Sequence, residues 1–115
     1  MKKIFIIFMC FFSVSSFASA YSCPVALPTN DVNFCSSFKT AATCHCISYP
    51  LPSSLCQDMN ILYNRMIAAY GSLQGACKKQ THTSMQDCID SWNCYRNGGV
   101  DSSGRVCSST RLACQ

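Results

Sequence analysis

The chain has 115 residues, 11 cysteines and a formal net charge of +4. This length predicts a single domain, which excludes a large or multi-domain enzyme. The cysteine count excludes a protein that is stable in a reducing compartment. The weak charge excludes the clustered basic face that nucleic-acid binding needs.

Residues 1–20 are predicted to be a cleaved secretory signal peptide. Lys2 and Lys3 precede an apolar run over residues 4–12, and the segment ends in the A-x-A cleavage pattern of residues 18–20. Cleavage before Tyr21 leaves residues 21–115 as one disulfide-rich domain, secreted from the cell or retained in the periplasm. No later apolar run reaches the roughly 20 residues that cross a bilayer, so we expect no membrane span.

Residues 21–29 are predicted to form an extended arm, because they contain Pro24 and Pro28. A helix is predicted over residues 31–45, since Asn30 suits an N-cap and apolar side chains recur at helical spacing from Phe34 onward.

The longest predicted helix covers residues 54–77. Its apolar stripe is wide, and Gly71 and Gly75 are positions that would bend or shorten it. We expect this face to be core, packed between the other two helices. The stripe comprises Leu55, Met59, Leu62, Tyr63, Met66, Ile67, Tyr70, Leu73 and Cys77.

A third helix is predicted over residues 84–96, with Trp92 on its apolar face and with Asp87 and Asp90 on its solvated side. Asn97-Gly98-Gly99 ends it. Strand-like alternation is absent from the sequence. The expected fold is therefore all-α: a small disulfide-rich bundle of about three helices, with a stapled N-terminal arm and an irregular C-terminal tail.

Ten cysteines are expected to form five disulfides, although spacing alone does not determine the pairs. Antiparallel packing favours Cys44 or Cys46 with Cys56, and also Cys77 with Cys88. Cys94 lies off the apolar face of its helix, so we expect it to form a disulfide with a cysteine of the tail. The ten are Cys23, Cys35, Cys44, Cys46, Cys56, Cys77, Cys88, Cys94, Cys107 and Cys114.

No catalytic or metal-ligating set emerges from the sequence. Cys44-His45-Cys46 has the side chains of a zinc site, but export favours oxidation of these thiols, so we expect no metal and no cofactor. His45 and His82 could act as acid and base with Lys78 or Lys79 nearby, yet nothing in the sequence positions them together. We interpret both histidines as ordinary turn residues.

These features favour an exported, non-catalytic interaction protein: an effector, inhibitor or signalling ligand. We expect a monomer that binds a protein outside the cytoplasm, because a crosslinked fold resists proteolysis and loses little entropy on binding. Four basic residues form the candidate partner surface, namely Arg65, Lys78, Lys79 and Arg96.

Two alternatives remain open. The first is a carrier of a small lipid or other apolar ligand, which would have a cavity beside Met59, Tyr63, Met66 and Ile67. The second is a small secreted hydrolase, in which His45 or His82 would lie in a cleft beside an Asp or a Lys.

Overall fold

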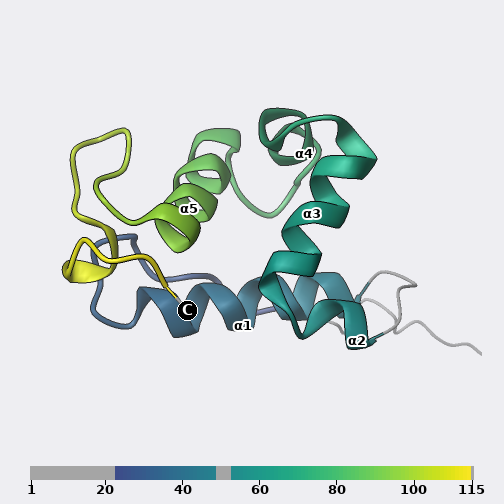
Figure 1. Cartoon of the computed structure of the whole chain (residues 1–115), viewed down its shortest axis with the longest axis horizontal. Helices are drawn as coiled ribbons and strands as arrows, with labels where there is room; N and C mark the ends of the chain where they lie inside the picture. Colours follow the sequence, from purple (N-terminus) through teal and green to yellow (C-terminus); the bar gives the residue numbers. More distant parts are fainter. Residues whose placement is uncertain (1–22, 49–52, 115) are drawn as a thin grey trace, which may run out of the picture.

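The computed structural model describes residues 23–48 and 53–114, and the predicted signal peptide lies outside these ranges. The expected all-α, disulfide-rich fold is confirmed (Figure 1). The described residues contain three longer helices, α1 (Phe34–Ile47), α3 (Met59–Tyr70) and α5 (Met85–Asn97). They also contain the short helices α2 (Ser53–Cys56) and α4 (Leu73–Lys78) and the 3-10 turn η2 (Cys107–Ser109).

Helix α1 begins three residues later than the sequence predicts. Asn30 does not cap it; instead the Asp31 carboxylate accepts a hydrogen bond from the Asn33 backbone N–H at 2.7 Å. The Asp31 N–H also donates to the Pro28 carbonyl oxygen, so residues 28–33 form turns rather than a first helical turn.

The helix predicted over residues 54–77 is divided into α2, α3 and α4, because two polar side chains start new helices. Asp58 accepts hydrogen bonds from the backbone N–H groups of Asn60 and Ile61 and caps α3. Gly71, with a φ of 84°, ends α3, and Ser72 caps α4 through the N–H of Gly75. The apolar periodicity continues across both breaks, between α2 and α3 and between α3 and α4, and therefore does not predict them.

Helix α5 and the tail agree with the predicted order of elements. Ser84 accepts a hydrogen bond from the Asp87 N–H at the start of α5, and Gly98 ends the helix. The tail then turns back, where the Gly99 N–H donates to the Arg111 carbonyl and the Cys114 N–H donates to the Tyr95 carbonyl. Figure 1 shows this yellow tail looping beside the end of α5 and returning to α1.

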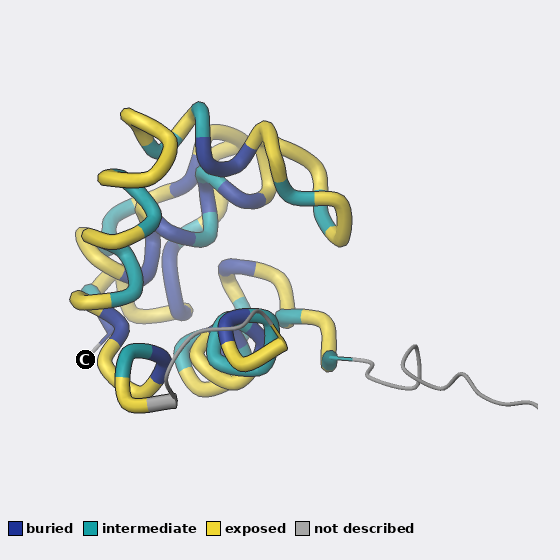
Figure 2. Tube along the Cα trace, turned by 90° about the vertical axis from the view of Figure 1, so that its right-hand side faces the viewer, coloured by how far each residue is buried: buried dark blue, intermediate teal, exposed yellow. Residues whose placement is uncertain are grey.

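The core is small and is built around aromatic rings. Phe38 of α1 meets Trp92 of α5 edge-on, with their ring centroids 4.9 Å apart. Phe34, Tyr95 and Met59 complete the buried apolar set, together with several disulfide cysteines. In Figure 2 the dark blue buried segments come from separate helices and face the interior, while much of the outer surface is exposed.

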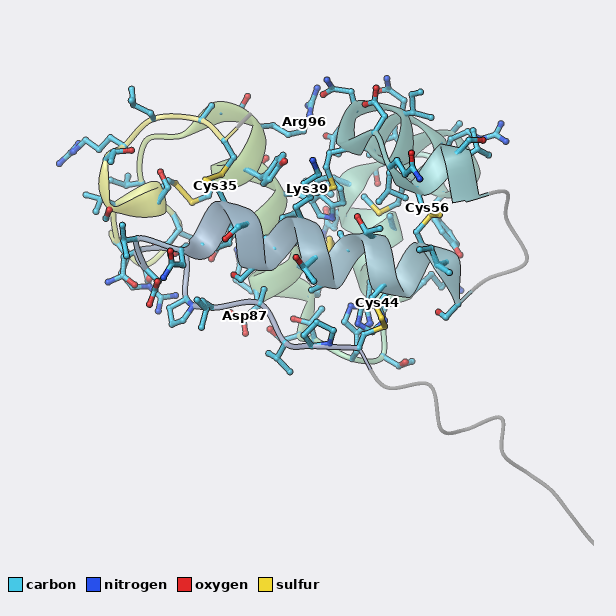
Figure 3. The ribbon with its side chains drawn as sticks, turned by 90° about the horizontal axis from the view of Figure 1, so that it is seen from below. Cys35, Lys39, Cys44, Cys56, Asp87 and Arg96 are labelled. Carbon is cyan, nitrogen blue, oxygen red and sulfur yellow. A yellow bond between two sulfur atoms is a disulfide. The ribbon has the colours of Figure 1, made fainter. Side chains whose placement is uncertain are left out.

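Five disulfides join the ten cysteines of residues 23–114. The pairs are Cys23–Cys44, Cys35–Cys114, Cys46–Cys56, Cys77–Cys88 and Cys94–Cys107. Three of the bridges start on α1, which Figure 3 shows from below with Cys35 and Cys44 toward opposite ends. They fasten α1 to the tail, to the arm and to α2. Such a set of bridges fits a protein that works outside the cytoplasm.

Two pairs agree with the expected helical hairpins, Cys46–Cys56 and Cys77–Cys88. Cys94 forms a disulfide with the tail residue Cys107, as its position off the apolar face of the helix suggests. The tail covers Cys94 so completely that it is buried rather than outward-facing.

The prediction that Asp90 lies on the solvated side of its helix is wrong. Asp90 is buried, and its carboxylate accepts hydrogen bonds from the Ser102 hydroxyl at 2.7 Å and from the Gln86 side chain. The tail supplies Ser102 and thereby covers this side of α5. Asp87 remains exposed, as predicted.

None of the helices in the described ranges has the length and the apolar character that crossing a membrane requires.

Candidate functional site

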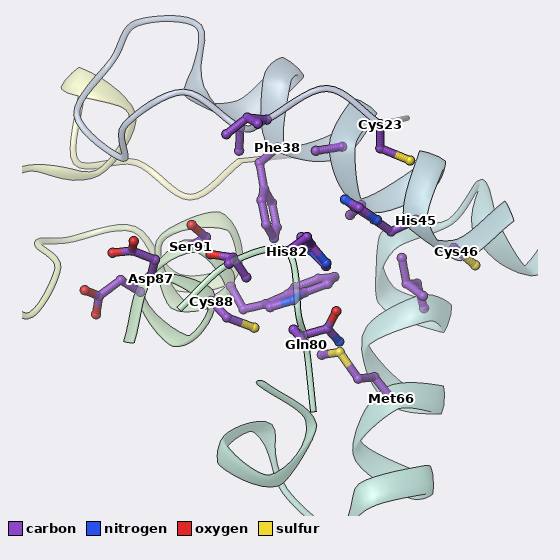
Figure 4. Close-up of a pocket in the computed structure, with 18 of the residues that line it drawn as sticks. Cys23, Phe38, His45, Cys46, Met66, Gln80, His82, Asp87, Cys88 and Ser91 are labelled. Atoms are coloured by element: carbon purple, nitrogen blue, oxygen red, sulfur yellow. The ribbon is translucent and has the colours of Figure 1, made fainter. Parts of the chain in front are cut away.

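A groove of about 910 Å³ lies between α1, α3, α5 and the N-terminal arm, and we call it the central groove (Figure 4). Phe38 points into it from α1 and Met66 from α3, while the loop between α4 and α5 runs along one side. Its volume falls within the range of about 300–1,000 Å³ that small-molecule sites have.

Most of the lining is apolar. The walls combine the edge of the aromatic core with small side chains that leave space between the helices. The apolar lining includes Ala26, Leu27, Phe38, Ala41, Ala42, Leu62, Met66, Ala68, Ala69 and Trp92. The alanine pairs 41–42 and 68–69 are a sequence signal for this space, because a larger side chain at these positions would occupy it.

Polar groups lie at the margins of the central groove. Figure 4 shows Asp87 and Ser91 of α5 at the opposite end from Met66, and Gln80 projects from the α4–α5 loop. Arg65 contributes from α3 and is exposed. Polar groups at the margin of an apolar groove can orient a ligand while its apolar part is buried.

The most specific contact in the central groove is between its two histidines. The rings of His45 on α1 and His82 in the α4–α5 loop stack with centroids 3.5 Å apart and an interplanar angle of 15°. The interpretation of both as isolated turn residues therefore fails for His45, which lies on α1, and overlooks their contact. His45 and His82 are 37 positions apart in the sequence, so no local sequence pattern predicts their contact.

Partial burial lowers the pKa of the His45 imidazole below its ordinary value of 6.5. Burial also lowers the pKa of His82, and positive charge on the neighbouring His45 lowers it further. Both effects favour the uncharged rings near neutral pH.

The stacked rings are poorly arranged to coordinate one metal ion. The lone pairs of stacked imidazoles lie in nearly parallel planes and do not converge on one ion. No cluster of three or more metal-binding side chains occurs within the described ranges. The hydrolase alternative expected His45 or His82 in a cleft beside an Asp or a Lys. Both histidines line the central groove together with Asp87 and Asp90, although no hydrogen bond joins either imidazole to these carboxylates within the described ranges.

Of the four residues beside which the carrier alternative expected a cavity, only Met66 lines the central groove. Met59 instead belongs to the core. Tyr63 packs on Trp92 and under the Arg96 guanidinium, 3.9 Å from its ring centroid. Ile67 does not line the central groove.

The four basic residues of the candidate partner surface are all exposed, but they do not share one hollow. Arg65 lines the central groove, whereas Arg96 lines a second hollow of about 360 Å³ with Lys39 and Asp58. Lys78 and Lys79 lie at the end of α4.

Comparison with known proteins gives no match of any kind: no family model, no curated protein and no solved structure matches the chain. The candidate site therefore rests on the geometry of the central groove.

Proposed function

We propose that the protein is an exported, non-catalytic carrier that holds the apolar part of a small lipid-like ligand in the central groove. The observation that carries the proposal is a groove of about 910 Å³ with mainly apolar walls. Burying an apolar chain there is favourable by roughly 25 cal/mol for each Å² removed from water.

Disulfides at the margins support this proposal. Cys23, Cys46 and Cys88 line the central groove, and each is bonded to another element or loop end. A site whose walls are crosslinked loses little conformational entropy when a ligand binds. The wide apolar face of α3 also fits this role, since Met59 is the only residue of that helix that is buried.

The test is binding of the neutral dye Nile red to the protein produced from the full-length sequence, with its disulfides formed. Ala69→Trp places an indole in the central groove from an exposed position on α3. We expect this variant to bind the dye at least about tenfold more weakly, a change of about 1.4 kcal/mol.

Asn64→Trp is the matched control, because Asn64 is exposed on the same helix and does not line the central groove. It should leave the dissociation constant within about twofold of the unmodified protein. Saturated fatty acids should displace the dye, with longer chains displacing it at lower concentration. Absence of dye binding, or equal weakening by both tryptophans, would contradict the proposal.

Binding of a protein partner outside the cytoplasm is the second candidate function. The arm favours it, because Val25 is 86% exposed and lies with Leu27 at the margin of the central groove. An exposed apolar margin is typical of interaction surfaces. Nile red binding that no fatty acid displaces would favour this candidate over the carrier.

A further inference from the structure

The α4–α5 loop forms one side of the central groove and meets α1 through the stacked histidines. Gln80, His82 and Thr83 of this loop line the groove. The ring of His82 lies against His45, so the stack joins the loop to the opposite wall. Figure 4 shows the two rings near the Met66 end of the groove.

The two partners of the stack differ in how firmly they are held. His45 lies between Cys44 and Cys46, which are bonded to the arm and to α2, so its position on α1 is fixed. His82 lies within the loop that Cys77–Cys88 closes. Within the described ranges, the backbone N–H groups of residues 81–84 donate no hydrogen bond to the protein. The loop is therefore held by fewer hydrogen bonds than α1.

Charge on the rings opposes the stack. Two protonated imidazoles with centroids 3.5 Å apart repel each other, whereas two neutral rings attract by stacking. Other charged groups line the same groove: Arg65 from α3, Asp87 and Asp90 from α5, and Arg105 from the tail. None of them contributes to the lowered pKa of either imidazole, which comes from burial and, for His82, from the charge of His45.

The direction of the pH effect follows from these pKa values. Each histidine has a lower pKa in the stack than its ordinary value of 6.5, and greater exposure to water in an open form would raise it back toward that value. The open form therefore binds more protons once the pH falls below about 6.5, and acid shifts the equilibrium toward it. Above that pH both forms are uncharged at these rings, and the stack is retained.

We propose that the His45–His82 stack is an acid-sensitive latch: neutral rings hold the α4–α5 loop against α1, and protonation of the pair frees the loop and opens the central groove. The release of ligand that this implies rests on the proposed carrier function. The latch itself is a property of the free protein.

The first experiment measures the Nile red dissociation constant and off-rate at pH 7.5 and pH 5.0. For the unmodified protein we expect acid to weaken binding by about fivefold or more, the lower end of ordinary coupling between two sites. His82→Phe keeps an aromatic ring in the stack but removes its proton site, so acid should weaken its binding less than it weakens binding by the unmodified protein, because only the His45 ring can still be protonated. His45→Phe is the matched variant from the other side and should behave in the same way.

The second experiment needs no ligand and separates failure of the latch from failure of the carrier function. In the free protein, NMR should show cross-relaxation between the ring protons of His45 and His82 at pH 7.5, and this signal should be lost at pH 5.0. If Nile red does not bind at all, the carrier function fails while the NMR signal still tests the latch. Persistence of the signal with both rings protonated, or an unchanged pH dependence in His82→Phe, would overturn the latch.

Discussion

Asp101 is a buried carboxylate that ties the arm to the tail. Its oxygens accept hydrogen bonds from the Thr29 hydroxyl at 2.6 Å, from Ser103 and from the Arg105 backbone and side chain. Burial alone would raise the pKa of this carboxyl, but the hydrogen bonds from Thr29, Ser103 and Arg105 outweigh burial and hold it well below the ordinary range. The charged carboxylate is thus part of the folded structure.

Replacing this carboxylate should lower the free energy of unfolding at pH 7 and should make that free energy less sensitive to acid. Since the folded pKa is depressed, the stabilisation from ionised Asp101 is present above the unfolded value of about 3.9 and is lost as the pH falls below it. We expect Asp101→Asn to reduce the free energy of unfolding by about 1–3 kcal/mol at pH 7. Urea denaturation at pH 7 and pH 3 measures both the loss and the weaker acid dependence.

Asp87→Asn is the control for this measurement, because Asp87 is exposed and its side chain makes no hydrogen bond within the described ranges. It should change the free energy of unfolding by no more than about 0.5 kcal/mol. Equal losses in the two variants would show that the Asp101 contacts do not stabilise the fold.

Single residues were predictable where their partners are close in sequence. Gly98 was expected at the end of the third helix, and the structure has it there, while Ser84, predicted as the first residue of that helix, is its N-cap. Asp101 and Thr29 are 72 positions apart, and His45 and His82 also meet only after folding, so no local signal predicts either contact. Asp90 was misplaced for the same reason: the Ser102 that covers it belongs to the tail.

At the scale of secondary-structure elements, apolar spacing located the helical regions but not all of their ends. Leu55 to Cys77 keeps a helical period across three separate helices, because consecutive helices can present apolar residues to one core. Asp58 and Ser72 are the N-caps that divide the region. Asp and Ser both favour N-cap positions, whereas the continuous apolar pattern favours one long helix. The tertiary structure shows that the caps prevail here.

The junction between α5 and the tail should be the backbone position most sensitive to an added methyl group. Gly98 has a φ of 71° and a ψ of −154°, a combination essentially restricted to glycine. A Cβ there would overlap the Arg111 carbonyl oxygen. We expect Gly98→Ala to destabilise the fold by about 2 kcal/mol or more, through strain and overlap with the returning tail.

Gly99→Ala separates these two contributions. Gly99 also has a positive φ, of 85°, but an added Cβ would meet no atom within 4 Å. Its expected cost is about 1 kcal/mol, from backbone conformation alone. Urea midpoints of the two variants give the comparison, and a Gly98→Ala protein as stable as Gly99→Ala would mean that the tail does not pack closely on this turn.

At the scale of the whole molecule, the disulfides compensate for a thin core. The fold class and the presence of five bridges followed from composition, and the two hairpin pairs followed from adjacent helices. Cys35–Cys114 could not be inferred, because it joins residues 79 positions apart whose meeting depends on the path of the tail. The central groove was also beyond local patterns, since its walls come from the arm, α1, α3, the α4–α5 loop and α5, which are far apart in the sequence.

Alkylation with and without prior reduction tests this crosslinked architecture together with the predicted export. We expect the mass of the isolated protein to match a chain that begins at Tyr21. The protein should take up no iodoacetamide before reduction and ten labels after reduction. Retention of the predicted signal peptide would add Cys10 and a single label before reduction. Labelling of two further cysteines without reduction would contradict the five-bridge structure.

The overlap of two bridges has a consequence for proteolysis. Cys23–Cys44 and Cys35–Cys114 close two rings that share residues 35–44, so each peptide bond from residue 23 to residue 114 lies inside at least one ring. A trypsin-like protease that hydrolyses the exposed bond after Lys78 would therefore release no fragment, and the product would be heavier by one water. The pieces would separate only on reduction, so an unchanged band on a non-reducing gel does not demonstrate an unbroken backbone.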